Sequence, residues 1–402
     1  MNCYMWNTAE HRLLMKKYRS ELLDFYQTRV VNPSGGFWWL GSDGIPLPEK
    51  GIQLWLSARM IHCFSLAHLD GRPGAFEVAQ QGVDFYYSGA GRDRDCGGWH
   101  EIVKDGVGSG KKDLYGLAHV ILASASASVA GINNAESLLS EALELLESKY
   151  WESEWGLALD TYDASFSHVD AYRGLNANMH LTEALLAAYE ATGKKRLFDM
   201  AVGIASFLVR KPVLSGRYRL VEHYDEQWKP TPNFNRDYPD HPFKPYGSTP
   251  GHWLEWAKLI MQIFAIDRSQ DWAVAAAKDL FEGAYRDAWL PGFAYTVDWD
   301  GAPIVSYRFW WPVTEAMGAA HLLAQHTDNS RYKDAYRELW QFADSYLIDH
   351  QNSGWFYELD DGLKPISRTW QGKPDLYHIY QAALYCELPF GVGLAKALSE
   401  RS

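Results

Sequence analysis

The sequence has few cysteines and no long apolar run. Its four cysteines, Cys3, Cys63, Cys96 and Cys386, are scattered without a C-x-x-C pair, which argues against a disulfide framework and against a cysteine-rich zinc site. No stretch approaches the ~18 apolar residues that a membrane-spanning helix needs, and charges interrupt the N-terminal segment. We therefore expect a cytoplasmic protein with reduced thiols, no export signal and no membrane segment.

Clusters of basic residues, nucleotide-binding motifs and the serine-hydrolase motif are also missing. Lys and Arg number 38 against 50 Asp and Glu, a net charge of −12, so a nucleic-acid partner is not expected. Neither G-x-x-x-x-G-K-[ST] nor G-x-S-x-G occurs, and no G-x-G-x-x-G follows a predicted strand. The prediction is that the protein uses no cofactor. With 47% apolar and 22% charged residues, the composition is that of a folded globular chain.

Internal repetition is the most informative feature that is present. Short segments rich in glycine and aromatic residues recur six times: GGFWWLGSDG (35–44), GGWHEIVKDG (97–106), EWGLALDTYD (154–163), GRYRLVEHYD (216–225), GFAYTVDWDG (292–301) and GWFYELDDGL (354–363). Each alternates apolar and polar residues and most end in turn-forming residues, which predicts hairpins. Six units in 402 residues correspond to about 67 residues per unit.

Two helices per unit are predicted from apolar residues at helical spacing. The leading helices are expected at 8–29, 74–88, 134–150, 195–211, 269–289 and 330–350, and the following helices at 50–69, 111–130, 172–192, 250–267, 311–326 and 374–387. The following set is the more apolar, which suits an inner layer. We predict a single domain over residues 1–402, an (α/α)6 barrel with short β-hairpins at one mouth; an open solenoid is the competing topology.

Three of the fourteen histidines have a distinctive context, at the starts of predicted inner helices: His180 in NANMHLTEA, His252 in STPGHWLEW and His378 in GKPDLYHIY. His252 and Glu255 share one helical face at spacing i, i+3, as do His180 and Glu183, so each pair brings imidazole and carboxylate together. A metal site would use such ligands, but no H-E-x-x-H occurs and we predict no metal. Other histidines are expected to be structural: His68, His119, His321, His326 and His350.

An arginine and several tryptophans complete the candidate site. Arg59 interrupts the apolar helix GIQLWLSARMIHCFS, where it needs acceptors, either in a buried ion pair or on a substrate oxygen. Trp55 lies one turn before it, and Trp310 and Trp311 begin another inner helix. Such rings usually belong to the core, but they also stack on the apolar faces of sugars. Imidazoles, carboxylates and an arginine suit proton transfer beside a polarised carbonyl.

The segments RMIHCFSLAH, NANMHLTEALLAAYEATG, PGHWLEWAKL, WWPVTEAM and GKPDLYHIYQA occur in this order over almost the whole chain. As a set they resemble the N-acylglucosamine 2-epimerase superfamily. The PDLYH segment and the overall length are most similar to its aldose–ketose isomerase branch, which includes mannose isomerases and sulfoquinovose isomerases.

The resemblance implies an (α/α)6 barrel that needs neither metal nor nucleotide. It implies that His252 and His378 are the acid/base pair acting through a cis-enediol, that Glu255 supports His252, and that His180 assists sugar-ring opening. The substrate-binding residues that it implies, with the aromatic residues selected above, are Arg59, Trp55, Tyr115, Asn176, Trp310 and Trp311. The substrate would be a monosaccharide and the protein a monomer or homodimer.

D-mannose and D-fructose are the expected pair, with D-lyxose and D-xylulose as a further possibility, because no basic cluster suggests a sulfonated sugar. The alternatives are a sugar 2-epimerase, a sulfoquinovose isomerase, an (α/α)6 glycoside hydrolase that uses carboxylates such as Glu255 and Glu315, and a glycan-binding barrel without activity. Product analysis distinguishes them: fructose from mannose indicates an isomerase, and glucose directly from mannose an epimerase.

Overall fold

The computed structural model describes residues 4–401, and most of them form helices. Their contacts divide the chain into two compact units. The first unit comprises Met1–Leu23, Ala205–Lys373 and His378–Val392, and the second comprises Asp24–Ile204, Pro374–Tyr377 and Gly393–Ser402. Each unit is described by itself. Among the described residues, no helix combines the length and the apolar character needed to cross a membrane.

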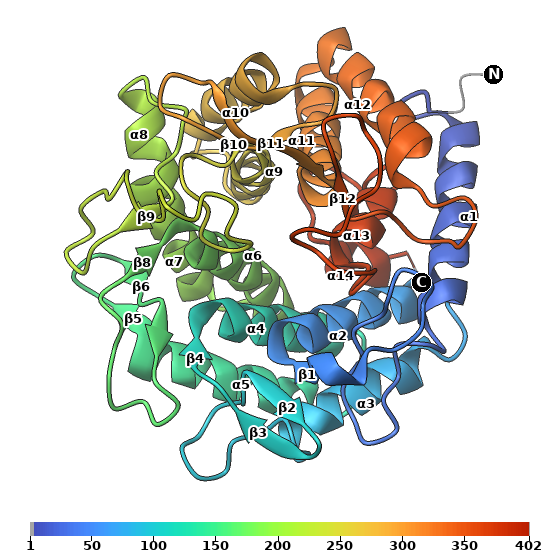
Figure 1. Ribbon diagram of the computed structural model, residues 1–402, viewed down its shortest axis with the longest axis vertical. Helices are drawn as coiled ribbons and strands as arrows, with labels where there is room; N and C mark the ends of the chain where they lie inside the picture. Colours follow the sequence, from blue (N-terminus) through green and yellow to red (C-terminus); the bar gives the residue numbers. More distant parts are fainter. Residues whose placement is uncertain (1–3, 402) are drawn as a thin grey trace. The chain divides into compact units, whose positions relative to one another are not determined.

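The second unit is built on three neighbouring buried helices, α2 (Leu54–Leu69), α4 (Leu114–Val129) and α6 (Leu175–Thr192). Helix α4 packs between α2 and α6, and Figure 1 shows the three side by side. Alanine and serine alternate from position 123 to 128 of α4, and small side chains allow neighbouring helices to approach closely. As predicted, these following helices are the more apolar set and are buried nearly all round.

Amphipathic helices cover this layer. Helix α3 (Ala75–Tyr87) packs against α2 and α5 (Ala135–Leu145) against α4. The buried residues of α5 follow the spacing i, i+3, i+4, i+7, i+8, so one stripe faces α4 and the rest faces solvent: Ala135, Leu138, Leu139, Ala142 and Leu143. The unit also contains helix α7 (Lys195–Ala205) and the short C-terminal helix α14 (Leu394–Ser399). Only the last residue of α7, Ala205, belongs to the first unit.

The first unit repeats this arrangement around α9 (Pro250–Ile266), which packs against α10 (Trp272–Ala288) and α11 (Trp310–Thr327). Helix α12 (Ser330–Phe342) covers α11. The remaining helices of the first unit are α8 (Lys211–Leu214), α1 (Ala9–Tyr26) and α13 (Tyr377–Tyr385). The last three residues of α1 and the first residue of α13 belong to the second unit.

The helix boundaries agree with the predicted ones to within a few residues, apart from the ends of three covering helices. Helices α5, α7 and α12 are each followed by one π-helical turn, at Leu146–Tyr150, Ser206–Arg210 and Ala343–Leu347. The same π-helical turn follows the covering helix in three of the six sequence repeats, which supports the internal repeat that the sequence predicts.

The strands are short, and among the described residues three of the six predicted hairpin segments take part in hairpins of paired strands. These are β2 (Ile102–Lys104) with β3 (Val107–Ser109), β5 (Trp151–Glu152) with β6 (Leu157–Ala158), and β10 (Ala294–Val297) with β11 (Pro303–Phe309). In these hairpins Val103 lies opposite Gly108, Trp151 opposite Ala158 and Ala294 opposite Arg308. The other segments supply two-residue strands or isolated bridges. The remaining two-residue strands are β1 (Ile52–Gln53), β4 (Lys112–Asp113), β7 (Thr161–Tyr162), β8 (Arg173–Gly174), β9 (His223–Tyr224) and β12 (Glu358–Leu359).

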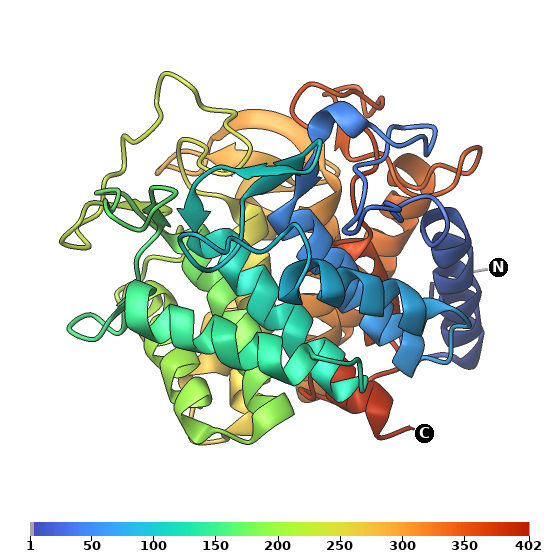
Figure 2. The same ribbon diagram turned by 90° about the horizontal axis from the view of Figure 1, so that it is seen from below.

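Strands lead directly into four of the buried helices. β1 precedes α2, β4 precedes α4, β8 precedes α6 and β11 precedes α11, with no residue between them. Within each unit the strands therefore mark the ends at which these helices begin. Figure 2 shows the teal strands β2 and β3 beyond one end of the neighbouring helices of the second unit. This end carries the candidate functional residues.

Candidate active site

The candidate residues occupy the same positions in successive buried helices. In α2, α4 and α6 the second and sixth residues are Trp55 and Arg59, Tyr115 and His119, and Asn176 and His180. In the first unit, α9 has Gly251 and Glu255, α11 has Trp311 and Glu315, and α13 has His378 in second place. Residues four apart lie on one face of a helix, so each helix presents its pair on one side at its N-terminal end.

Arg59 is the centre of a cluster in the second unit. Its Nε donates a hydrogen bond to Nε2 of His119 at 2.9 Å, and its Nη2 donates one to the hydroxyl of Tyr115 at 2.7 Å. Nη1 lies 3.5 Å from a carboxylate oxygen of Asp375, and the guanidinium lies over the rings of Trp55 and Tyr377 at 5.0 and 4.6 Å. Four of these contacts come from segments distant in sequence, so Arg59 is held rigidly.

His119 is neutral in this cluster. Burial, together with the nearby Arg59 and His180, holds its pKa well below the usual range. Its Nδ1 lies 2.7 Å from the carbonyl oxygen of Tyr115, which fixes the proton on Nδ1 and leaves Nε2 to accept from Arg59. The sequence analysis assigned His119 a structural role, and the structure places it between Arg59 and His180.

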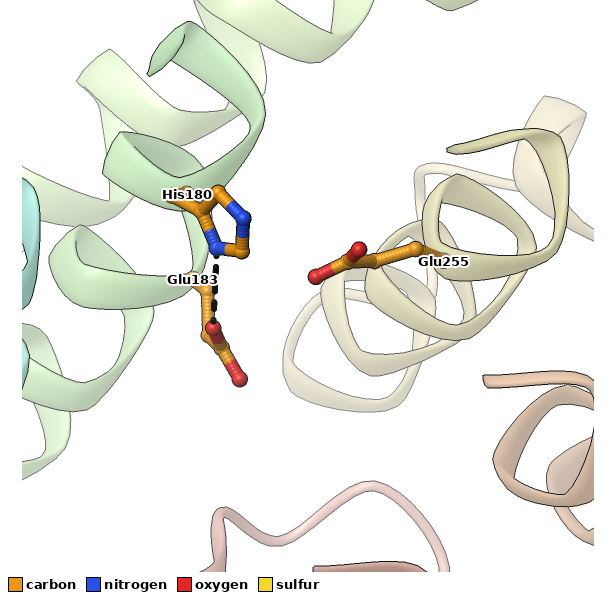
Figure 3. Close-up of side chains that lie close together, drawn as sticks. All are labelled: His180, Glu183 and Glu255. Atoms are coloured by element: carbon orange, nitrogen blue, oxygen red, sulfur yellow. Dashed lines mark ion pairs between the residues drawn. The ribbon is translucent and has the colours of Figure 1, made fainter. Parts of the chain in front are cut away.

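His180 and Glu183 form the predicted i, i+3 pair on α6, with Nδ1 and a carboxylate oxygen 3.8 Å apart (Figure 3). The hydroxyl of Tyr377 donates a hydrogen bond to Glu183, and the rings of His119 and His180 are 4.7 Å apart. The pair offers a cation one nitrogen and one oxygen ligand. Figure 3 also draws Glu255, which belongs to α9 of the first unit.

In the first unit, His252 is held by a carboxylate that the sequence analysis did not select. Its Nδ1 lies 2.8 Å from Oε2 of Glu222, and Oε1 of Glu222 accepts the backbone N–H of Thr249 at 3.1 Å. All of these groups are buried. Since the carboxylate accepts from Nδ1–H, Nε2 is the nitrogen left for proton exchange. Glu255, the residue expected to support His252, lies one turn further along α9.

His378 is held in the same way by Glu315. Nδ1 of His378 lies 2.7 Å from Oε1 of Glu315, and Oε2 of Glu315 lies 2.5 Å from the ammonium of Lys258. Burial by itself would raise the pKa of Glu315, but Lys258 and His378 outweigh burial and lower it. Glu315 is therefore a carboxylate that is shared between an ammonium and an imidazole.

Trp311 contacts both imidazoles. Its ring centroid lies 5.2 Å from that of His252 and 6.2 Å from that of His378. Gly251 is required here, because a Cβ at this position would lie 2.4 Å from Cη2 of Trp311. Since real Cβ atoms essentially never come so near a ring carbon, the glycine before His252 allows the indole to lie against the start of α9.

The neighbouring Trp310 stacks on Tyr357 at 3.8 Å and contacts His378 at 6.3 Å between ring centroids. Its side chain is buried, and among residues 4–401 no group accepts a hydrogen bond from its indole N–H. A buried donor without an acceptor is costly in a protein interior. A ligand hydroxyl is one group that would satisfy it.

The structure thus gathers His252, His378, Trp310 and Trp311 in the first unit, and Arg59, Trp55, Tyr115 and His180 in the second. Asn176 lies one turn before His180 on α6. The contact residues that the sequence analysis passed over are Glu222, Lys258, Asp375 and, as a functional candidate, His119. His119 could have been selected from the sequence, because it is the sixth residue of its helix, as Arg59 and His180 are of theirs. The signal for Glu222 was weaker: it is a carboxylate in the alternating segment RLVEHY, at a position that the structure shows to be buried.

Comparison with known proteins identifies the family of this chain. The sequence profile of the N-acylglucosamine 2-epimerase (GlcNAc 2-epimerase) family matches residues 35–382. A D-mannose isomerase of Thermobifida fusca is 39% identical, over 98% of this chain and 99% of that protein. A D-mannose isomerase of Pseudomonas cannabina pv. alisalensis is 37% identical, over 85% of each chain.

Solved structures show the same fold. A crystal structure of a D-mannose isomerase matches with a TM-score of 0.87 and 29% identity, over 94% of this chain and 98% of that chain. A cellobiose 2-epimerase from Spirochaeta thermophila matches with a TM-score of 0.79 at 21% identity, over 94% of this chain and 98% of that chain. The predicted (α/α)6-barrel fold class is confirmed by these matches. The chain belongs to the N-acylglucosamine 2-epimerase family.

Proposed function

We propose that this protein is an aldose–ketose isomerase that interconverts D-mannose and D-fructose through a cis-enediol. The observation that carries the proposal is the pair of buried imidazoles, His252 and His378, in contact with one indole ring and each held at Nδ1 by a buried carboxylate. Two such groups suffice for an isomerisation that moves only protons. The names of the similar proteins support mannose as the sugar.

In the proposed reaction, Nε2 of His378 takes the proton from C2 of open-chain mannose and returns it to C1. His252 transfers a proton between O2 and O1, so that the C1 carbonyl becomes a hydroxyl and C2 becomes the new carbonyl. The electrons of the broken C–H bond remain in the enediol, and no oxidant or cofactor is needed. General acid–base assistance supplies about 10²- to 10⁴-fold, and positioning and electrostatics supply the rest.

The unsatisfied indole N–H of Trp310 supports a polyhydroxylated ligand beside His378. Trp311, in contact with both imidazoles, offers the flat apolar face on which a sugar carbon skeleton packs. The roles of other residues stay predictions that rest on the family resemblance: ring opening by His180, support by Glu255, and substrate binding by Arg59, Trp55, Tyr115 and Asn176.

The glycoside hydrolase alternative is weakened by the state of Glu315. A hydrolase needs one carboxylic acid that holds its proton near neutral pH, which requires a raised pKa. The contacts of Lys258 and His378 lower the pKa of Glu315 despite its burial. A 2-epimerase uses the same imidazoles and returns the proton to the opposite face of C2, so products distinguish it from an isomerase.

The proposal is tested by incubating the metal-stripped protein with mannose, glucose, lyxose and sulfoquinovose in D₂O and following products and label by NMR. We expect fructose from mannose, with deuterium at C1 to the extent that the base exchanges with solvent. Glucose formed directly from mannose would make the protein a 2-epimerase. Absence of both products and of exchange at C2 would contradict the proposal.

We further propose that the protein is cytoplasmic, that it is a monomer or a homodimer, and that the chain forms one catalytic domain.

Replacement of His378 by Asn tests the assignment of the base. We expect turnover of mannose to fall by at least about 10²-fold while sugar binding, measured by calorimetry, persists. His350→Asn is the matched control, because His350 is exposed on the surface. A fully active His378→Asn protein would remove His378 from the mechanism.

A further inference from the structure

Glu183 and Tyr377 are buried side chains of the second unit that take no part in the proton transfers proposed for His252 and His378. Tyr377 is the first residue of α13, and its hydroxyl donates a hydrogen bond to Oε2 of Glu183. The same carboxylate oxygen lies 3.8 Å from Nδ1 of His180, which Figure 3 shows directed at Glu183. One line of contacts therefore runs from Tyr377 through Glu183 to the imidazole of His180.

Ring opening is the step of the proposed reaction that needs a further proton-transfer group. Mannose in water is almost entirely a pyranose, and its C2 proton becomes acidic only when C1 is a carbonyl. Opening breaks the bond between C1 and O5 and moves one proton from O1 to O5, while the electrons stay within the sugar. His119 is unsuited to this transfer, because both of its ring nitrogens are in hydrogen bonds, with the carbonyl oxygen of Tyr115 and with Arg59. His180 is the other imidazole at the sixth position of a buried helix in the second unit.

Glu183 is placed to orient His180 and not to touch the sugar. The candidate sugar contacts are the second and sixth residues of their helices, whereas Glu183 is the ninth residue of α6 and lies almost one turn further from the helix start. A carboxylate beside Nδ1 favours the tautomer with its proton on Nδ1, which leaves Nε2 to exchange protons with the sugar. The hydrogen bond from Tyr377 fixes the carboxylate in turn.

A repeated segment of sequence supports this assignment. Thr-Glu-Ala occurs in α6 and in α11, where it contains Glu183 and Glu315. In both helices its glutamate lies beside Nδ1 of a histidine, at 3.8 Å from His180 and at 2.7 Å from His378. A further polar side chain, a tyrosine hydroxyl in one unit and a lysine ammonium in the other, holds the carboxylate. The repeat of this arrangement indicates that Glu183 serves His180 as Glu315 serves His378.

We propose that Glu183 and Tyr377 are positioning residues for sugar-ring opening. The hydroxyl of Tyr377 fixes the carboxylate of Glu183, and this carboxylate orients His180 to move a proton from O1 to O5 of the pyranose. The proposal rests on the proposed isomerase function for its substrate, mannose. It requires these two contacts, whatever else surrounds His180, and a single substitution removes each of them.

Mutarotation measures ring opening apart from isomerisation, because α- and β-mannopyranose interconvert through the open chain. The test uses freshly dissolved α-mannose and the His378→Asn protein, which lacks the proposed base for C2, and follows the anomers by NMR. We expect this protein to accelerate mutarotation, and the additional change Tyr377→Phe or Glu183→Gln to reduce the acceleration by about tenfold. Sugar binding, measured by calorimetry, should persist in both variants.

Tyr377→Phe removes a single oxygen and keeps the ring, whose centre lies 4.6 Å from the guanidinium of Arg59, so a loss is due to the hydroxyl. Tyr346→Phe and Glu77→Gln, at exposed positions, are the matched controls and should leave mutarotation unchanged. If Glu183→Gln fails to fold, Tyr377→Phe decides alone.

A slowed Tyr377→Phe protein with His378 intact should turn over mannose and mannose deuterated at C2 at equal rates, because ring opening then limits turnover. A clear isotope effect in this variant would place the loss at C2 and would overturn the proposal. Mutarotation at the His378→Asn rate in both double variants, or no acceleration by the His378→Asn protein, would also overturn it. A protein that forms no fructose but loses mutarotation through these changes would refute the proposed function and retain this proposal.

Discussion

At the scale of single residues, each imidazole of the proposed acid/base pair depends on a carboxylate that is distant along the chain. Glu222 precedes His252 by 30 residues, and Glu315 precedes His378 by 63. The nearer candidate, Glu255 at i+3, follows from helical geometry, and helical geometry decides only which residues share a face. Which carboxylate reaches Nδ1 depends on the loop that brings Glu222 to the start of α9.

Glu222→Gln should lower kcat for mannose by at least about tenfold with little change in KM. The amide keeps the volume and one acceptor oxygen, but it removes the negative charge beside Nδ1 of His252 and, because it can also donate, weakens the choice of tautomer. Steady-state kinetics measure the effect, and Glu226→Gln is the control because Glu226 is exposed four residues later. An unaltered kcat would show that His252 needs no carboxylate at Nδ1.

At the scale of elements, the starts of the buried helices carry the chemistry, and strands and loops set where those helices start. The sequence predicted a helix from residue 50, whereas α2 begins at Leu54, because Pro48–Lys50 form a 3₁₀ turn and Ile52 and Gln53 pair with β2. Periodicity locates a helix well and its first turn poorly, since the first turn is decided by strand pairing and capping.

One loop near Trp310 is organised by a buried carboxylate. Glu358 on β12 accepts the backbone N–H groups of Arg368, Thr369 and Trp370 at 3.0, 2.7 and 3.2 Å. The ring of Trp370 then contacts Trp310 at 5.6 Å between centroids. Three hydrogen bonds to one anion hold the loop in a single conformation, and charge-assisted hydrogen bonds are the stronger kind.

Glu358→Gln should therefore raise KM for mannose several-fold while kcat stays within about twofold, because the variant loosens a loop beside the proposed sugar site without touching the imidazoles. Hydrogen exchange followed by mass spectrometry should show faster exchange in residues 366–372. Glu338→Gln, at an exposed position of α12, is the control. Unchanged exchange in this loop would contradict the role of Glu358.

At the scale of the whole molecule, buried charges and buried neutral histidines make stability depend on pH. Each unit contains a buried lysine–aspartate pair, Lys112 with Asp93 at 2.6 Å and Lys373 with Asp349 at 2.8 Å. In both pairs burial opposes ionisation of the aspartate, but the lysine and hydrogen bonds prevail and lower its pKa. Their contribution is present above the unfolded pKa of aspartate and is lost as the pH falls below it.

His321 affects the stability of the protein at a higher pH than the two aspartates do. Burial lowers its pKa to about 3, whereas in the unfolded chain it takes up a proton near pH 6.5. Between these values the unfolded state binds more protons, so stability falls as the pH decreases, by about 2 kcal/mol from this residue between pH 7 and pH 5. His321→Gln, which keeps an acceptor for the indole N–H of Trp6, should lose that part of the dependence in urea unfolding. His350→Gln should retain the full slope, and an equal slope in both variants would contradict the assignment.

The sequence by itself predicted the repeat and the helices, because periodicity and turn residues are local properties of the chain, and its resemblance to a family implied the acid/base residues, which stay a prediction. A single domain over 1–402 stays a prediction. Only the tertiary structure decided that Glu222 supports His252, that Glu315 lies between Lys258 and His378, and that Gly251 makes room for Trp311. Ion pairs and ring contacts act over a few ångströms between segments far apart in sequence, and no local pattern encodes which segments meet.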